Sequence, residues 1–370
     1  MFKLSAIFSA AAISGFMFMN PVNGNAQTVQ KVSGGKAGET GIAYNLPNTA
    51  IDITIETEFT VKKPGELYKY ARRYFNISDP ITKESASATV KSVVISTHGV
   101  SAPDQAYLLD FKAGKAPFMM LDPSGFPLAV NTENLYEPNK PEMPVAVPAA
   151  PTALEGQAAR QALSEEIMQS QSTAKRAELV AAQIFALRQS RNDLITGQAD
   201  QMPPDGKAME LILNTINAQE AALMAMFTGT TQTWTNVNTI SYTPDGTRDI
   251  ETRRVIARVS PTQGLVATDD LSGVPVYLSL NVTERPEMPV NAKGQVIEIP
   301  KDGFIYNIPG KVNVNVSFDN RTLADETIDM AQYGIKYGLK PNVFIDKKSP
   351  AYVTFDPATG AIIELGNVAQ

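Results

Sequence analysis

His98 is the only histidine in this chain of 370 residues, and the chain contains no cysteine. Zinc sites are usually built from several histidine and cysteine side chains, and a Ser-His-Asp triad needs histidine as its general base. A lone His98, placed before Gly99 at the end of a predicted strand, is more often structural than catalytic. We therefore predict no metal site and no cofactor, and we find no sequence support for a triad.

Ser172 and Lys175 have the Ser-x-x-Lys spacing of penicillin-binding enzymes. In those enzymes the site is completed by Ser-Asp-Asn and Lys-Thr-Gly patterns further along the chain. Neither pattern occurs here. Because two fixed positions in four arise readily by chance, we assign no catalytic role to this pair.

Pairs of neighbouring acids leave open a different class of function, a hydrolase acting on glycan or cell wall through two carboxylates. Such enzymes need carboxyl groups about 5 to 10 Å apart, whereas acids adjacent in sequence more often point apart on a solvated face. The loop from Asp269 to Gly273 also lacks the ladder of oxygen ligands of an EF-hand. We predict no catalytic residue, and the hydrolase remains the alternative. The pairs are Glu165-Glu166, Asp269-Asp270 and Asp325-Glu326.

Trp234 is the single tryptophan. A passive carbohydrate-binding module would present exposed aromatic side chains as a platform, and this is a further alternative function. We expect Trp234 instead to pack in the core or against a helical hairpin, where its large ring contributes most to stability.

The N-terminus predicts a secretory signal peptide over residues 1–26. Lys3 supplies the positive charge, residues 4–19 form the apolar stretch, and Ala26 ends a small-residue cleavage site. The apolar stretch is shorter than the roughly 20 residues of a membrane span, so an uncleaved anchor is the weaker alternative. A lipid anchor would need a cysteine at the cleavage point. We therefore expect export to the periplasm or to the periplasmic face of the outer membrane, with no membrane span and no lipid anchor.

The formal net charge is −6, and removal of Lys3 with the signal peptide would change it to −7. Acidic and basic residues are interspersed, and no basic cluster is present. Nucleic-acid-binding proteins concentrate positive charge on one face, so nucleic acid is not an expected partner.

Changes in the hydrophobic pattern divide the first half of the chain. Residues 27–43 are polar and rich in glycine, which predicts a flexible leader. An N-terminal α+β repeat is predicted over 44–136, with a strand in which Ile51, Ile53 and Ile55 alternate with polar residues. A short helix over 66–75 and strands over 89–97, 106–111, 118–121 and 126–130 are expected to follow. Five prolines then predict a semi-rigid linker over 137–151.

A central antiparallel helical hairpin is predicted over 152–229. Thr152 and Glu155 form a capping box, and an apolar pattern continues from there to Gly197. Unbroken, this first helix would hold about 40 residues and measure about 60 Å. A second helix is predicted from about Asp205 to Phe227. A β segment over 230–285 follows, with strands at 234–242, 254–259 and 274–282.

The two ends of the chain share short motifs in the same order, which predicts an internal repeat with a C-terminal α+β copy over 286–370. In each copy a tyrosine-asparagine motif precedes a strand of β-branched residues, a short helix is expected next, and an Asp-Pro turn closes a terminal β-hairpin. The matching segments are Tyr44-Asn45-Leu46-Pro47 with Tyr306-Asn307-Ile308-Pro309, and residues 115–125 with 348–360.

Several motifs spread over nearly the whole chain carry a resemblance to a known family. They are Tyr44-x-Leu46-Pro47, Pro64-Gly65 with Tyr70-Ala71, residues 191–197, Pro204-Asp205-Gly206, residues 226–229, Asp270-Leu271-Ser272-Gly273-x-Pro275-Val276-Tyr277, and Gly303-Phe304-Ile305-Tyr306-x-Ile308-Pro309-Gly310. On these motifs the chain resembles the Bacteroidota family called domain of unknown function 4831. The resemblance implies an exported protein of a Gram-negative envelope, and it supplies no catalytic residues.

Taken together, the sequence predicts an α+β fold of two related β-rich repeats with a central antiparallel helical hairpin. The hypothesis that follows is a non-enzymatic binding or scaffold protein of the cell envelope, with an envelope protein as partner. Glycan binding and carboxylate-pair hydrolysis are the alternatives.

Overall fold

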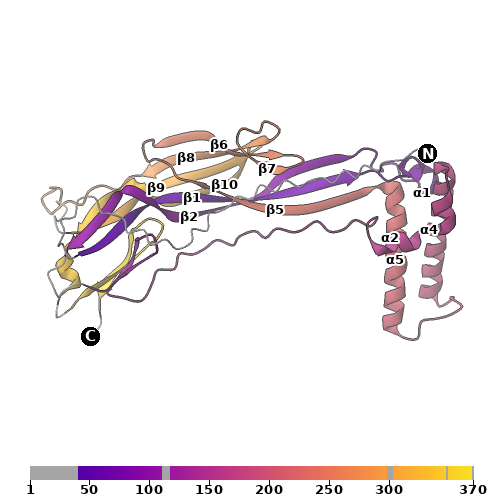
Figure 1. Cartoon of the computed structure of the whole chain (residues 1–370), viewed down its shortest axis with the longest axis horizontal. Helices are drawn as coiled ribbons and strands as arrows, with labels where there is room; N and C mark the ends of the chain where they lie inside the picture. The colour runs from indigo at the N-terminus through magenta and orange to yellow at the C-terminus, as the bar shows by residue number, and fades with distance from the viewer. Residues whose placement is uncertain (1–40, 111–116, 298–302, 347–348, 369–370) are drawn as a thin grey trace, which may run out of the picture. The chain divides into compact units, whose positions relative to one another are not determined.

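A computed structural model describes residues 41–110, 117–297, 303–346 and 349–368 of the chain (Figure 1). The fold is α+β, with three antiparallel sheets and a group of helices. The predicted signal peptide, residues 1–26, and the predicted leader up to residue 40 lie outside the described residues. The last three leader residues, 41–43, belong to the first strand.

The first sheet has three strands in the order β2-β1-β5, with β1 in the centre. The predicted alternation along β1 is confirmed, because Ile51, Ile53 and Ile55 are fully buried. The strands predicted at 89–97 and 106–111 belong, as far as Asp110, to one long strand, β2, which pairs with β1 through two irregularities in register. The bounds are Gly41–Lys63 for β1, Ser85–Asp110 for β2 and Thr230–Tyr242 for β5.

The second sheet has five strands in the order β10-β9-β8-β6-β7 and packs face to face on the first. Val312, Val314 and Val316 of β9 point into the shared core, where they meet the three isoleucines of β1. Alternate residues of a strand face opposite sides of its sheet, so the intervening asparagines of β9 face outward. The bounds are Ile250–Ser260 for β6, Gly264–Val266 for β7, Val274–Glu284 for β8, Phe304–Phe318 for β9 and Arg321–Leu339 for β10.

The prediction of a short helix after the first strand of the C-terminal repeat is wrong. Strands β9 and β10 are joined directly by Asp319 and Asn320, both with positive φ (48° and 60°). Asp and Asn tolerate this left-handed conformation, which a two-residue hairpin turn requires. In the N-terminal half, the expected short helix is present as a 3-10 turn η1, Tyr68–Tyr70, followed by α1, Ala71–Phe75.

The third sheet brings together segments from the two ends of the chain, in the order β12-β11-β4-β3. Strands β3 and β4 flank the turn at Asp122, and β11 and β12 flank the turn at Asp356. Strand β4 pairs with β11, for example through Val130 and Val353. The bounds are Met119–Leu121 for β3, Pro127–Val130 for β4, Ala351–Phe355 for β11 and Ile362–Asn367 for β12, and a 3-10 turn η2 covers Pro341–Phe344.

The proline-rich segment over 137–151 forms neither helix nor strand. It lies along the outer edge of β5, where Val147 and Thr235 exchange two hydrogen bonds of 2.9 Å. Gln232 donates a further bond of 2.7 Å to the carbonyl of Ala150. These three hydrogen bonds hold the segment against the sheet at two positions, Val147 and Ala150.

The long helix predicted from Thr152 is broken into three pieces. Ser164 and Ser172 each accept a hydrogen bond from the backbone N–H three residues later, at 3.4 Å, so each starts a new helix. Glu155 does reach back to the Thr152 N–H at 2.9 Å, but the first helix begins only at Gln157. The pieces are α2, Gln157–Ala162; α3, Glu165–Gln169; and α4, Thr173–Thr196, which at 1.5 Å per residue is about 36 Å long.

Helices α4 and α5, Gly206–Thr228, lie side by side at the end of the first sheet where β1 ends and β5 begins (Figure 1). They run antiparallel, because Arg188 contacts Glu220 and Met224 while Arg191, further along α4, contacts Asn217. Their shared core is separate from the sheet cores and includes Leu67 and Ala71 from the segment after β1. No helix among the described residues is long and apolar enough to cross a membrane.

Candidate functional site

A surface hollow with a volume of about 480 Å³ lies where the Asp122 and Asp356 turns meet the middle of β2. It includes His98, the one histidine of the chain, and residues of the proline-rich segment. Three carboxylates and an imidazole in one hollow make it the first candidate for chemistry. The polar residues that line it are Thr97, His98, Asp122, Tyr136, Asn139, Asp329, Asp356 and Thr359.

The two turn aspartates are occupied by their own turns. Asp122 Oδ1 accepts the backbone N–H groups of Ser124 and Phe126, each at 2.8 Å. Asp356 accepts the Ala358 N–H and the Thr359 hydroxyl, each at 2.9 Å. Aspartate at the first position of a turn commonly binds backbone groups in this way. Their contacts are those of residues that stabilise turns.

An asparagine from β1 or β9 anchors each turn. The Asn45 N–H donates to Gly125 O at 2.8 Å, and its side chain donates to Ser124 O at 3.0 Å. The Asn307 N–H donates to Gly360 O at 3.2 Å, and its side chain donates to Thr359 O at 2.8 Å. The same motif residue therefore makes the same two contacts in each half of the chain.

His98 is close to Asp52 and, through it, to Ser241. His98 Nδ1 lies 2.6 Å from Asp52 Oδ2, and the Ser241 hydroxyl donates to the other oxygen of Asp52. A catalytic serine must donate to the histidine rather than to the aspartate. Here the Ser241 hydroxyl group donates to Asp52, so His98 is not placed to activate Ser241 as a nucleophile. Sequence reasoning missed Asp52 and Ser241 because only the strand register places them opposite each other.

The Ser-x-x-Lys pattern has a structural explanation. Ser172 caps the N-terminus of α4 by accepting the Lys175 backbone N–H, and the Lys175 ammonium group pairs with Glu178 at 3.2 Å. The serine oxygen therefore caps the helix and the lysine ammonium group pairs with a glutamate, so the two groups do not form a catalytic pair.

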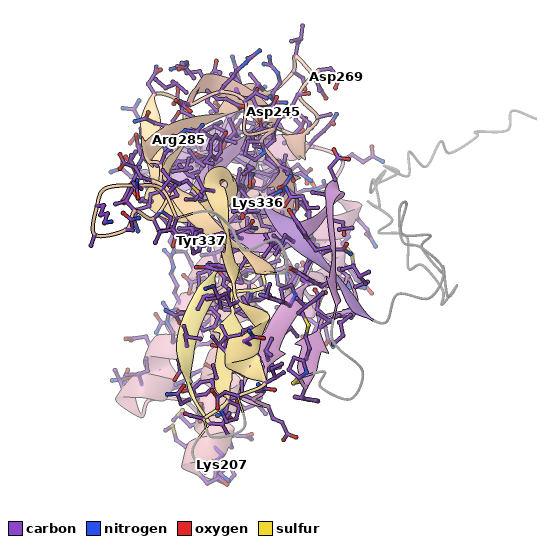
Figure 2. All side chains as sticks on the ribbon, turned by 90° about the vertical axis from the view of Figure 1, so that its left-hand side faces the viewer. Lys207, Asp245, Asp269, Arg285, Lys336 and Tyr337 are labelled. Atoms are coloured by element: carbon purple, nitrogen blue, oxygen red, sulfur yellow. The ribbon has the colours of Figure 1, made fainter. Side chains whose placement is uncertain are left out.

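The three acid pairs lie in separate places. Glu165 and Glu166 occupy the first turn of α3, where negative charge is favourable. Asp269 is exposed at the outer surface of the loop after β7 (Figure 2), and Asp270 binds the Ser272 hydroxyl and N–H, which lowers the pKa of its carboxyl group. Asp325 accepts hydrogen bonds from Asn313 and Asn315 on the outer face of β9.

Glu56 is a buried carboxylate, 7% exposed, on β1. The Ser92 hydroxyl donates to it at 2.7 Å and the Lys91 ammonium group at 3.0 Å, and together these contacts hold its pKa below the usual range. A general acid of a glycosidase needs the opposite shift. Glu56 is therefore suited to stay ionised at neutral pH.

Trp234 is half-buried and stacks on Phe59 of the neighbouring strand, with ring centroids 5.1 Å apart and planes 2° from parallel. Gly264 closes over the Phe59 ring, since a Cβ there would lie 2.2 Å from its Cζ atom. Of the two predicted surroundings, the core and the helical hairpin, the structure has the first, because Trp234 packs on Phe59, a buried residue of β1.

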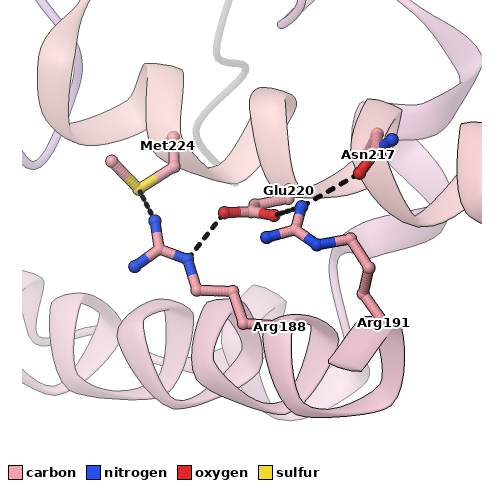
Figure 3. A network of polar contacts seen from close by, with 5 residues as sticks. All are labelled: Arg188, Arg191, Asn217, Glu220 and Met224. Atoms are coloured by element: carbon pink, nitrogen blue, oxygen red, sulfur yellow. Dashed lines mark hydrogen bonds and ion pairs between the residues drawn. The ribbon is translucent and has the colours of Figure 1, made fainter. Parts of the chain in front are cut away.

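The second candidate site is the polar network between α4 and α5 (Figure 3). Glu220 is 9% exposed and accepts from Arg188 Nε and from Arg191 Nη1, each at 2.6 Å. Asn217 and Met224, one turn away on either side, accept the remaining contacts at 2.9 and 3.7 Å. One carboxylate thus holds two guanidinium groups, which leaves a local excess of positive charge. The sequence had predicted no functional role for Glu220 or for the residues that bind it.

We expect Glu220→Gln to lower the free energy of unfolding by about 1 to 3 kcal/mol, because it removes the counter-charge of two partly buried arginines. The value is at the lower end of that range if water screens the arginines, whose side chains are 38% and 33% exposed. Urea unfolding monitored by circular dichroism measures this. The matched control is Glu210→Gln, at an exposed position of the same helix, and an equal loss in both variants would contradict the prediction.

Comparison with known proteins gives one result for nearly the whole chain. The profile of a family described as domain of unknown function (DUF4831) matches residues 40–363. No curated protein and no solved structure matches the chain.

Proposed function

We propose that this chain, which belongs to the DUF4831 family, is a non-enzymatic binding or scaffold protein of the cell envelope, and that its helical hairpin contacts a protein partner. The observation that carries the proposal is the exposed apolar surface at the far end of the hairpin. Ile195 is the last residue but one of α4, Met202 lies in the connection and Leu211 lies in the second turn of α5. They are 66%, 48% and 69% exposed.

These three residues, here called the tip residues, lie where α4 and α5 are joined. The other end of α5 adjoins the first sheet, because only Gly229 separates Thr228 from β5. The tip residues therefore contribute little to the hairpin core, which is filled by Ile184, Leu223 and other side chains. Exposed apolar side chains that lie near one end of an element are candidates for a protein-binding surface.

The unbroken helix of about 60 Å predicted from the sequence is absent. The proposed contact surface is therefore formed by the tip residues. Export to the periplasm or to the periplasmic face of the outer membrane remains part of the proposal. It rests on the predicted signal peptide over residues 1–26.

Duplication of an ancestral unit is also part of the proposal. Two observations support it: Asn45 and Asn307 bind their turns alike, and the motif tyrosines each face another tyrosine across a β-ladder. Tyr44 pairs with Tyr107, and Tyr306 pairs with Tyr337. A scaffold protein needs a rigid frame, and paired units would supply one.

Affinity purification from the native envelope tests the partner. We expect the wild-type chain to recover a stoichiometric protein, and we expect a variant with serine at the three tip positions to lose it while keeping its unfolding midpoint. The control variant carries serine at Val145 and Leu271, which are 79% and 81% exposed elsewhere. Recovery of no stoichiometric partner, or equal recovery by the tip variant, would overturn the proposal.

A further inference from the structure

A second hollow, with a volume of about 610 Å³, lies at the junction of α1, α4 and α5. Two aromatic rings are among its lining residues: Phe75 and Phe185 lie 5.5 Å apart with tilted rings, and Phe185 is 49% exposed. The Arg188 guanidinium group lies over both rings, at 5.6 and 6.0 Å from their centroids. Arg72 and Arg73, both exposed, complete the rim. The hollow is of the size that accommodates a few side chains of a ligand.

The arginines of this hollow have more donors than the protein uses. Among the described residues, no carboxylate lies within ion-pair distance of Arg72 or Arg73, and neither side chain has a hydrogen bond to protein. Arg188 uses Nε for Glu220 and Nη2 for the sulfur of Met224. Each guanidinium group has five N–H donors in a planar fork that fits a carboxylate.

Charge in this region is opposite in sign to that of the whole chain. Arg72, Arg73 and Arg188 meet at the hollow, and Arg191 adjoins Arg188 through Glu220. Within the described part of the chain, Arg188 and Arg191 share the carboxylate of Glu220, and Arg72 and Arg73 have no carboxylate at ion-pair distance, whereas the formal net charge of the protein is −6. A localised positive hollow on an acidic protein attracts a negatively charged group.

We propose that this hollow binds an acidic peptide segment of a protein partner, in which a carboxylate lies beside an aromatic or aliphatic side chain. The carboxylate pairs with Arg72 and Arg73, and the apolar side chain covers Phe185. The inference rests on the proposed function, because it names the chemistry of the partner that a binding protein would recruit. Arginines without a carboxylate partner would by themselves bind any anion, and Arg73 lies over the Tyr74 ring. The exposed Phe185 ring beside them favours a ligand that also carries an apolar group.

The test uses the full chain and a fluorescein-labelled synthetic peptide of alternating glutamate and phenylalanine, with binding measured by fluorescence anisotropy. We expect saturable binding that weakens with added salt, and at least tenfold weaker binding by the variant Arg72→Glu with Arg73→Glu. The matched control makes the same charge change at exposed sites elsewhere, Lys140→Glu with Lys207→Glu, and should change the affinity by less than twofold. Phe185→Ala should remove the preference for phenylalanine over serine in the peptide.

Several outcomes would overturn the inference. They are no binding of the glutamate-phenylalanine peptide, equal binding of its lysine counterpart, no effect of the arginine variant, or displacement of the peptide by inorganic phosphate or by vesicles of anionic lipid at comparable concentration. The result is separable from the tip experiment. If the envelope partner is still captured through the tip while the peptide fails to bind, only this inference falls; if the peptide binds and no partner is captured, only the proposed function falls.

Discussion

Gly65→Ala is expected to lower the free energy of unfolding by about 3 kcal/mol or more. A Cβ atom at Gly65 would lie 2.2 Å from the Met226 carbonyl oxygen and 2.6 Å from that of Ala225. Both are backbone atoms at the end of α5, so the steric clash cannot be removed by rotation of a side chain. It can be removed only if α5 moves away from the segment that follows β1.

Such a shift would also disturb the hydrogen bond from the Leu67 N–H to Met226 O, 2.8 Å long, and the position of Leu67 in the helical core. We therefore expect the helices of the variant to open before the sheets do. Urea unfolding combined with limited proteolysis of the α4–α5 connection measures both effects. The control is Gly206→Ala at the first residue of α5, where a Cβ has nothing within 4 Å.

At that control position, alanine reduces the freedom of the unfolded chain and should raise stability by up to about 1 kcal/mol. If the two variants behave alike, the close approach at Gly65 does not determine how the hairpin is attached.

Asn307→Ala is expected to cost about 2 to 4 kcal/mol. Asn307 is 3% exposed, and its side chain donates to Pro47 O at 3.1 Å and to Thr359 O at 2.8 Å. Alanine would leave both buried carbonyls without that donor, and each unsatisfied buried group costs about 1 to 3 kcal/mol. Thermal or urea unfolding measures the loss.

The chain supplies its own control in Asn45, which occupies the matching motif position. Its side chain makes one bond, to Ser124 O, at a more exposed site. Because water can replace that donor, Asn45→Ala should cost no more than about 1 kcal/mol. Equal losses at both positions would mean that burial does not distinguish the two motifs.

Local patterns predicted the local structure. The alternation of Ile51, Ile53 and Ile55 identified the buried face of β1, and the prolines of 137–151 identified a segment without helix or strand. The same reasoning was wrong in two places. It continued a helix through Ser164 and Ser172, because a periodic apolar pattern says nothing about which serine binds the backbone as a cap. It also expected a second short helix where Asp319-Asn320 allows β9 to turn directly into β10.

The candidate sites depend on pairing between distant segments, which a single sequence does not reveal. Asp52 meets His98 across a β-ladder, and Glu220 meets Arg188 and Arg191 across a helix pair. Each of these residues has an ordinary local context. Their roles follow from strand register and from helix packing, both of which depend on the whole fold.

The pairing of β4 with β11 also has a consequence for how the chain reaches its native state. Val130 of β4 pairs with Val353 of β11. Strand β1 pairs with β5 across a similar distance in sequence, for example through Ile51 and Tyr242. Closing such long loops costs entropy before any contact compensates for it, and chains dominated by distant contacts fold slowly. The strands of the first half of the chain, β1 and β4 among them, lack some of their pairing strands until the last strands of the chain are available. The proline-rich segment therefore connects two halves that mature together, and cutting the gene there would yield fragments with unpaired strand edges rather than two autonomous proteins.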